Sequence, residues 1–505
     1  MRTILALSIV ALFFVPTLSF DTGRAHTGDI GRIAPSFHEK LADALISDRF
    51  DIIVRFDSPA GEHAALLSRL GLETDIVLDS INAASMEATK AQILDLSRAE
   101  GVVYIECDEP LAYFMEVSAV AIGASSIWNY AILDDGEVVY DDHGYMKRID
   151  GRGVTAVVLD TGIDAGHPDL DYGTKTIKNE KREESGWTEM ENSDTSSGHG
   201  THCAGTVAGN GDASAGQRRG VAPGANLYGM STGEGLSIIY AVEALERVYQ
   251  QSRPNENPYN IRVVSNSWGT SGDRYDPNGA ITQIVEKLVY ENHVAVVFAA
   301  GNDGGDGTDI RTNPYSNIPA SIGVAAALRD GTGIADFSSR GHRDIQETWP
   351  DVAAPGVDIW STAPRGTLID GSQRPTDDDL YYMAISGTSM ATPHVAGVVA
   401  LLYQAAPSLG VSPVHEDYSG GEGGPPASEW YNDTTTLVSE AELILEATAD
   451  YIEPPAEGVP SGNWTNDHGH RFDFAQGCGL VNVTRAVKVA LALERLRTYD
   501  GDGDG

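Results

Sequence analysis

The sequence predicts an α/β protein in which a doubly wound, mostly parallel sheet is preceded by a small α+β domain. Two observations lead to this fold class. After Gly153, short apolar runs rich in β-branched residues alternate with segments of helical length, as in a sheet covered by helices on both faces. Before them, residues 50–107 follow the order β-α-β-β-α-β, which is that of a split βαβ sandwich.

The small domain is expected to open with a buried strand at 50–56 and to close with a strand at 101–107. Thr89 and Gln92 have the spacing of a capping box and mark the start of its second helix. The elements in between are a helix and two paired strands: 61–70, 75–79 and 83–87.

The larger domain follows a polar, Asp-rich entry at 115–150, in which Trp128 is the expected anchor. Four apolar runs have the length of buried parallel strands: 154–159, 263–266, 294–300 and 322–327. Four other segments fit helices: 200–207, 237–250, 279–291 and 389–405. Functional residues of such sheets gather at the carboxyl ends of the strands. Asp160 and Asn302 each follow a strand and Ser389 begins a helix, so these three are candidate site residues.

The C-terminal part of the chain contains an expected insertion. Residues 407–436 are rich in Pro, Gly and acidic residues, which predicts a surface insertion into the larger domain. The domain then resumes at 439–448 and ends with a helix to about residue 497. Residues 498–505 form an acidic, low-complexity tail.

The composition is strongly acidic: among 505 residues, 73 Asp and Glu stand against 34 Lys and Arg, a net charge of −39. A protein that binds nucleic acid needs a basic surface for the phosphates, so this balance argues against nucleic acid as a partner. The acidity fits a well-solvated surface. It equally fits adaptation to high salt, where ions screen the repulsion between carboxylates, and the sequence leaves both interpretations open.

Residues 1–20 have the pattern of a secretory signal peptide, with Arg2 before an apolar run from 4 to 15 and Pro16 after it. We therefore expect a secreted, extracellular protein. The cleavage site is poorly marked, so retention at a membrane by an uncleaved leader is the alternative. No other stretch has the length of a membrane span, and no stable membrane insertion is expected.

Three cysteines occur, Cys107, Cys203 and Cys478, which are too few for a disulfide framework and include no Cys-x-x-Cys metal pair. Cys203 and Cys478 either pair or stay free. Buried free thiols are the default, and the sequence does not decide between the two states.

Three short motifs present an aspartate, a histidine and a serine in that order along the chain. They are Asp160-Thr161-Gly162 after an apolar run, His199-Gly200-Thr201-His202 at a helix start, and Gly387-Thr388-Ser389-Met390-Ala391 at another. Hydrolysis of an amide needs a nucleophile, a base that takes its proton and a group that orients the base. The order Asp, His, Ser separates one of the convergent solutions to this problem from the others.

These motifs resemble those of the subtilase family, the subtilisin-like serine proteases, and the stretch 387–397 carries the likeness furthest. The resemblance implies a subtilisin-like catalytic domain that needs no cofactor for its chemistry. It also implies roles: Ser389 as the nucleophile, His199 as the base and acid, and Asp160 as the orienting carboxylate. Asn302 matches the side-chain donor of the family's oxyanion hole.

Substrate contacts follow from the same resemblance. Ser267, Trp268 and Gly269 match the segment that lines the first specificity pocket, and Gly233 and Gly235 belong to the strand that pairs with extended substrate. Both segments would bind the backbone of a protein or peptide by strand addition. Trp268 is bulkier than the leucine often found there, which leaves the size of the pocket in doubt.

A structural calcium ion is implied by Asp169, which matches a carboxylate that binds calcium in several subtilases. The partner loop at 209–219 departs in length and carries two arginines, so calcium there stays open. A metal pair of His199 and His202 lacks the further ligands of a closed zinc site, and His202 is expected to be structural. Cys203, directly after His202, resembles the proteinase K branch, where a thiol lies close to the histidine.

By its position the ferredoxin-like domain resembles the inhibitory propeptide of subtilases, which spans 21–114 here with its core at 50–107. A free-standing ferredoxin-like domain is the alternative. We expect self-cleavage near Phe114, which leaves a monomeric peptidase domain at 115–497 and a propeptide that acts as inhibitor and folding partner. The whole is expected to be a secreted, self-processing serine endopeptidase. A processing protease of narrow specificity and an inactive peptide-binding protein are the rival interpretations.

Overall fold

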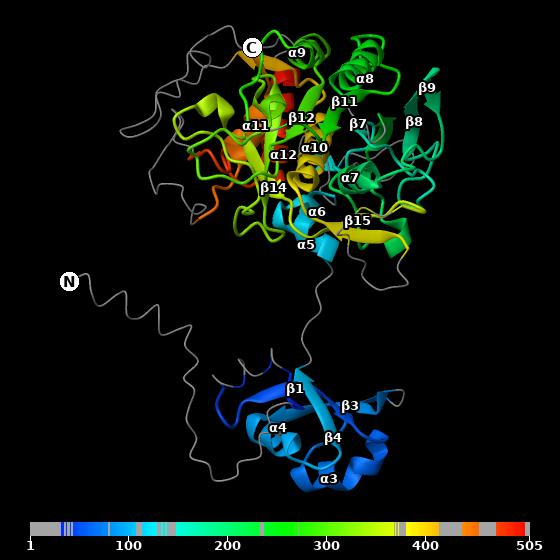
Figure 1. The fold of residues 1–505 in the computed structure, drawn as a ribbon, viewed down its shortest axis with the longest axis vertical. Coiled ribbons are helices and arrows are strands. Elements are labelled where there is room, and N and C mark those ends of the chain that lie inside the picture. The colour runs from blue at the N-terminus through cyan, green and yellow to red at the C-terminus, as the bar shows by residue number, and fades with distance from the viewer. Residues whose placement is uncertain are drawn as a thin grey trace, which may run out of the picture. The chain divides into compact units, whose positions relative to one another are not determined.

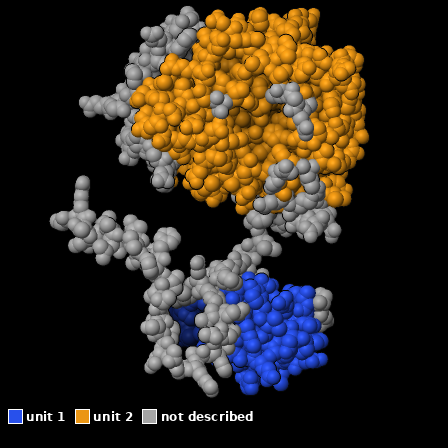
Figure 2. Space-filling model, in the orientation of Figure 1, with its two compact units in different colours: residues 1–112 blue, residues 113–505 orange. Residues whose placement is uncertain are grey.

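The chain forms two compact units in this computed structural model, Met1–Ala112 and Tyr113–Gly505 (Figure 2). The residues that the structure describes are 32–34, 37, 41, 44–78, 81–107, 114–128, 133–134, 137–138, 148–232, 237–270, 272–367, 369, 372, 380–413, 437–453 and 471–499. The expected signal peptide at 1–20 lies outside them. Within the described part, no helix combines the length and apolarity needed to cross a membrane.

The first unit has the predicted β-α-β-β-α-β order. Its strands form an antiparallel sheet in the order β2-β3-β1-β4: β1 Arg49–Phe56, β2 Ile76–Leu78, β3 Ala83–Thr89 and β4 Val102–Cys107. The helical segments between them are η3 Ala60–His63, α3 Ala64–Leu70 and α4 Lys90–Ser97. The capping box is confirmed, since Thr89 Oγ1 accepts from the Gln92 backbone N–H and the Thr89 N–H donates to Gln92 Oε1 at 2.8 Å. Ile93 and Leu96 of α4 pack on the sheet in one core.

The second unit is built on an eight-stranded sheet in the order β14-β13-β12-β11-β7-β10-β8-β9. Every neighbouring pair is parallel except β8 with β9. The strands are β7 Thr155–Asp160, β8 Thr176–Glu183, β9 Gly186–Glu189, β10 Asn226–Ser231, β11 Ile261–Asn266, β12 Ala295–Ala299, β13 Ser321–Ala327 and β14 Val352–Pro355.

Helices cover both faces of this sheet (Figure 1). Strand β7 is apolar throughout because both of its faces are buried. Ala156 and Val158 pack under α7 and α10, while Val157 and Leu159 pack under α8 and α9. The helices are α5 Phe114–Ala121, α6 Ala124–Ile127, α7 His199–Ala208, α8 Ile238–Gln251, α9 Ala280–Asn292, α10 Thr388–Ala405, α11 Glu440–Thr448 and α12 Val483–Tyr499. The doubly wound α/β fold is therefore confirmed.

Strand β8 was not predicted, because its three buried residues, Thr176, Asn179 and Glu180, are all polar. Asn179 accepts from the Ser193 hydroxyl at 2.7 Å, and Glu180 accepts from Arg247 Nη2 at 2.6 Å. These partners come from distant parts of the chain, so the hydrophobic pattern of the strand does not reveal its burial.

The structure adds helices or strands to three segments of the second unit. The polar entry at 115–150 contains most of the helix α5 and all of α6, which were not predicted. Trp128 anchors this segment by donating from Nε1 to the Val221 carbonyl at 2.9 Å. The expected insertion at 407–436 includes the strand β17 Val411–Pro413, which pairs with β18 Leu437–Ser439. Residues 414–436 lie outside the described part. The last helix runs to Tyr499, so the first residues of the expected acidic tail are helical.

Candidate active site

Asp160 and His199 meet at the carboxyl end of the central strand β7. His199 Nδ1 lies 2.7 Å from Asp160 Oδ1, and the two side chains are only 18 % and 4 % exposed. The contact depends on Gly200, where a Cβ atom would lie 2.3 Å from the carbonyl oxygen of Gly162. Only glycine allows α7 to begin this close to the loop that follows β7.

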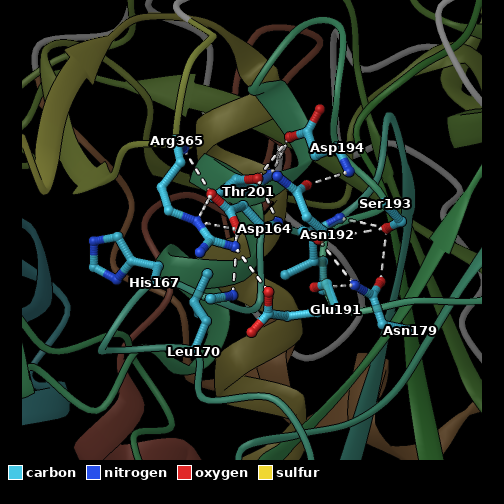
Figure 3. A network of polar contacts seen from close by, with 12 residues as sticks. Asp164, His167, Leu170, Asn179, Glu191, Asn192, Ser193, Asp194, Thr201 and Arg365 are labelled. Atoms are coloured by element: carbon cyan, nitrogen blue, oxygen red, sulfur yellow. Dashed lines mark hydrogen bonds and ion pairs between the residues drawn. The ribbon is translucent and has the colours of Figure 1, made fainter.

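Asp194 holds the start of α7 in place. Its Oδ1 accepts from the Gly198 N–H at 2.9 Å, and its Oδ2 accepts from the N–H and hydroxyl of Thr201 at 3.0 and 2.6 Å (Figure 3). These contacts satisfy backbone donors that a helix start leaves without partners, so Asp194 fixes the orientation of the helix that presents His199. Sequence analysis missed this role. An aspartate ahead of the helix with a threonine inside it is the weak signal that was available.

Ser389 lies in the first turn of α10 on the other side of the site. Its Oγ donates to the Ser267 carbonyl at 3.1 Å, and among the described contacts this hydroxyl is not bonded to His199. Cys203 Sγ lies 3.8 Å from His199 Nδ1 and 3.4 Å from the Ser389 carbonyl oxygen. The expected closeness of this thiol to the histidine is confirmed, and the sulfur also contacts the backbone of Ser389, which was not expected.

Pro393 shapes the surroundings of Ser389. A proline has no N–H, so the Ser389 carbonyl, four residues earlier, lacks the usual helical donor. This carbonyl instead accepts from Ser267 Oγ at 2.8 Å and lies in contact with Cys203. The proline thus lets the helix that carries Ser389 bond to the segment that was predicted to line the first specificity pocket.

Asn302 is held beside Ser389 by the chain that precedes it. Its Oδ1 accepts from the backbone N–H of Thr388 at 2.8 Å and from the Thr388 hydroxyl at 3.0 Å. A backbone N–H can only donate, so the oxygen of the amide must face Thr388. The amide NH₂ of Asn302 is left to donate elsewhere.

A cavity of about 320 Å³ lies between these residues. It is lined by Ser267, Trp268, Gly269, Thr270, Ala299, Gly301, Asn302, Asp303, Asn313, Thr388 and Ser389. The bulk of Trp268 is directed into the core, because its Nε1 donates to the Leu159 carbonyl at 2.9 Å and its ring meets Phe298 edge-on at 5.2 Å. The structure thus groups Ser267, Trp268 and Gly269 with Ser389 and Asn302. Gly233 and Gly235 lie outside the described residues.

The charge of Asp160 sets the protonation of the site. Burial works to lower the pKa of His199, but the adjacent Asp160 carboxylate outweighs it and holds that pKa well above its usual value. Burial raises the pKa of the Cys203 thiol, which keeps the sulfur neutral.

His202 differs from His199, because burial lowers the pKa of His202 to about 3. Its Nε2 is bonded to the Ile359 carbonyl at 2.8 Å. A neutral, bonded imidazole fits the structural role expected of His202.

Asp169, the residue implied as a calcium ligand, is bonded to the protein through both carboxylate oxygens. Asp169 is fully buried, its Oδ1 accepts from the Ala213 N–H at 2.7 Å and its Oδ2 accepts from the Tyr382 hydroxyl at 2.7 Å. Each oxygen of Asp169 therefore already accepts one hydrogen bond from the protein, and calcium binding at Asp169 stays a prediction. Among the described residues the cysteines form no disulfide, so Cys203 and Cys478 are not paired with each other, and both are buried.

Comparison with known proteins agrees with this geometry. Residues 151–479 match the model of the Subtilase family. The serine protease AprX of Bacillus subtilis is 36 % identical over 285 residues, which cover 54 % of this chain and 61 % of that protein. Subtilisin E of Bacillus subtilis is 31 % identical over 336 residues, covering 65 % of this chain and 72 % of its own length. A solved structure titled S41 psychrophilic protease is 26 % identical, covers 72 % of this chain and 97 % of its own, and has a TM-score of 0.49. From the family match and the coverage of subtilisin E, the chain belongs to the subtilase family, the subtilisin-like serine endopeptidases.

Proposed function

We propose that this chain is a secreted, self-processing serine endopeptidase that cleaves peptide bonds with Asp160, His199 and Ser389. The observation that carries the proposal is the 2.7 Å contact between Asp160 and His199 beside a serine in the first turn of α10. Members of the family need no cofactor for this chemistry.

In the proposed acylation step the Ser389 hydroxyl turns from the Ser267 carbonyl toward the imidazole. Its proton passes to His199 Nε2 while Oγ bonds to the carbonyl carbon of the substrate. Asp160 accepts the hydrogen bond from Nδ1, which keeps the proton on that nitrogen and leaves Nε2 free to act as the base. The same proton then passes to the leaving amine, and a water molecule hydrolyses the acyl-enzyme in the reverse sense.

The negative oxygen of the tetrahedral intermediate requires donors close to Ser389. We assign this role to the amide NH₂ of Asn302, which the bonds from Thr388 to Oδ1 leave available. The Ser389 N–H lies in the first turn of α10, where backbone N–H groups have no partner inside the helix, and it is the second donor. The cavity at Ser267, Trp268 and Gly269 would receive the substrate side chain before the scissile bond.

Secretion and self-processing are the finer part of the proposal. The apolar leader at 1–20 supports secretion. Two compact units that divide between Ala112 and Tyr113 support a removable propeptide, with cleavage near Phe114 and a monomeric product. In this scheme the first unit acts as inhibitor and folding partner of the second, and protein or peptide chains are the substrates.

A fluorophosphonate probe tests the nucleophile directly, because it forms a bond only with a serine whose proton is taken by a base. We expect one covalent adduct, located by mass spectrometry on the peptide that contains Ser389, and its loss in the folded His199→Ala variant. An adduct on another serine, or none on Ser389 in protein that circular dichroism shows to be folded, would contradict the proposed roles.

A further inference from the structure

Ser267 and Ser389 exchange two hydrogen bonds, each from the hydroxyl of one residue to the backbone carbonyl of the other. Ser389 Oγ donates to the Ser267 carbonyl at 3.1 Å, and Ser267 Oγ donates to the Ser389 carbonyl at 2.8 Å. Ser267 directly follows strand β11, and Ser389 lies in the first turn of α10. The two bonds therefore join the end of a central strand to the start of the helix that carries the proposed nucleophile.

Only one of these two bonds can persist during the proposed reaction. The Ser389 hydroxyl must leave the Ser267 carbonyl and turn toward His199 before its proton can be taken. The bond from Ser267 Oγ to the Ser389 carbonyl involves no atom that has to move in this step. It therefore holds the backbone of Ser389 in place while the side chain of Ser389 rotates.

Pro393 makes the bond from Ser267 to the Ser389 carbonyl necessary. In a regular helix this carbonyl would accept from the backbone N–H four residues later, but that residue is Pro393, which has no N–H. The preceding carbonyl, that of Thr388, does accept within the helix, from the Thr392 hydroxyl at 2.8 Å. The Ser389 carbonyl thus depends on a donor from another element.

The other group at the Ser389 carbonyl is a weak substitute for Ser267. Cys203 Sγ lies 3.4 Å from this oxygen, and a thiol is a poor hydrogen-bond donor. Ser267 is buried, so removal of its hydroxyl would leave the Ser389 carbonyl with the thiol alone. A carbonyl without a good donor is costly, and the first turn of α10 would shift toward another donor.

We propose that Ser267 is a positioning residue for the nucleophile. Its hydroxyl holds the Ser389 carbonyl in place of the N–H that Pro393 lacks, and so keeps Ser389 Oγ within reach of His199. This inference rests on the proposed role of Ser389 as the nucleophile. It concerns the hydroxyl of Ser267, whereas the expected contact of this segment with substrate concerns its backbone.

A double-mutant cycle tests this role, because the chain itself offers a replacement donor. Ser267→Ala removes the hydroxyl and retains the backbone carbonyl. Pro393→Ala gives residue 393 an N–H, which can donate to the Ser389 carbonyl as in a regular helix. The cycle compares the parent, the two single variants and the double variant. Ser185→Ala, at an exposed serine in the turn between β8 and β9, is the matched control.

Each variant is expressed as the full chain, and its concentration of active sites is taken from the amount of Ser389 that a fluorophosphonate labels at saturation. We measure kcat and KM on a peptide amide and the rate of labelling. Ser267→Ala should lower kcat by about 10- to 100-fold and leave KM within about twofold, because the nucleophile is misplaced while the substrate contacts remain. The rate of labelling should fall by a similar factor, and Ser185→Ala should behave as the parent.

The decisive comparison is the effect of Ser267→Ala in the two backgrounds. We expect Ser267→Ala to cost several-fold less kcat when Pro393→Ala is present, because the new N–H takes over the Ser389 carbonyl. Equal factors in both backgrounds would overturn the proposal, since Ser267 would then act independently of that carbonyl. Unchanged kinetics in Ser267→Ala, or a higher KM with the same kcat, would also overturn it. A folded parent without label on Ser389 would instead refute the proposed function, and the inference with it.

Discussion

The guanidinium of Arg365 binds both carboxylate oxygens of Asp164, with Nη2 2.6 Å from Oδ1 and Nε 2.9 Å from Oδ2 (Figure 3). Asp164 is fully buried and lies four residues after Asp160, whereas Arg365 follows strand β15 Ile359–Thr362. Gly166 makes room for the pair, because a Cβ atom there would lie 1.9 Å from Arg365 Nη2. The ion pair therefore links the segment after β15 to the loop that follows Asp160.

Replacing Arg365 should destabilise the peptidase unit. Arg365→Ala leaves the buried Asp164 with its bonds to backbone N–H groups only, so we expect a loss of about 1–3 kcal/mol in the free energy of unfolding. Because the guanidinium is half-exposed, we expect this loss to be smaller than for a fully buried ion pair. Urea denaturation in the Ser389→Ala background measures it. Lys287→Ala, which breaks an exposed pair with Glu291, is the control and should cost far less than Arg365→Ala. Equal losses in the two variants would contradict this role of Arg365.

The pH dependence of activity should reflect the raised pKa of His199. The base must be unprotonated, so kcat/KM falls as the pH drops through the pKa of His199, which Asp160 holds above its ordinary value of 6.5. Asp160→Asn removes the negative charge that favours the protonated imidazole. This variant should therefore move the acid limb of the profile to lower pH while kcat falls by up to about 10⁴. An acid limb that stays in place in Asp160→Asn would show that another group titrates.

Asn302 should act in the transition state rather than in substrate binding. Asn302→Asp keeps an oxygen that accepts from Thr388 but lacks the amide NH₂, whereas Asn302→Ala removes both. Both variants should lose kcat with little change in KM, by roughly 10²–10³, a magnitude taken from the corresponding amide of a subtilisin. Steady-state kinetics on a peptide amide checks this. Nearly full activity in Asn302→Asp would mean that Asn302 serves only to hold Thr388.

A mercurial reagent should inhibit the enzyme through Cys203, whose sulfur contacts both His199 and the Ser389 backbone. Burial raises the pKa of this thiol, so inhibition should be slow and should become faster as the pH rises. Cys203→Ala should resist the reagent. Cys478→Ala, which removes the other buried thiol, should remain as sensitive as the parent. An active parent enzyme that a mercurial leaves untouched after long exposure would contradict the prediction.

The sequence predicted those parts of the molecule whose determinants are local. The apolar strands, the capping box at Thr89 and the order of Asp160, His199 and Ser389 all depend on short stretches of chain, and the structure brings the first two of these site residues together. Sequence could not reveal Arg365 as the partner of Asp164, because the two are far apart in the chain and the pairing follows only from the fold.

Two other features were missed for a related reason. The polar strand β8 is buried because Arg247 neutralises Glu180, and the capping role of Asp194 depends on how its loop turns back to Thr201. In each case a polar residue is stabilised by a partner from another element, so its own neighbours in the sequence give little indication of its environment.

The central claim is that Ser389 is the nucleophile of a protease that processes its own chain. Intact mass and N-terminal sequencing of the purified protein beside its Ser389→Ala variant test this claim most directly. We predict that only the parent loses its first unit, with a new N-terminus near Phe114, and that added parent enzyme cleaves the variant in the same region. Full-length protein in both preparations, with salt and calcium present, or the same truncation in both when no other protease is added, would contradict the claim.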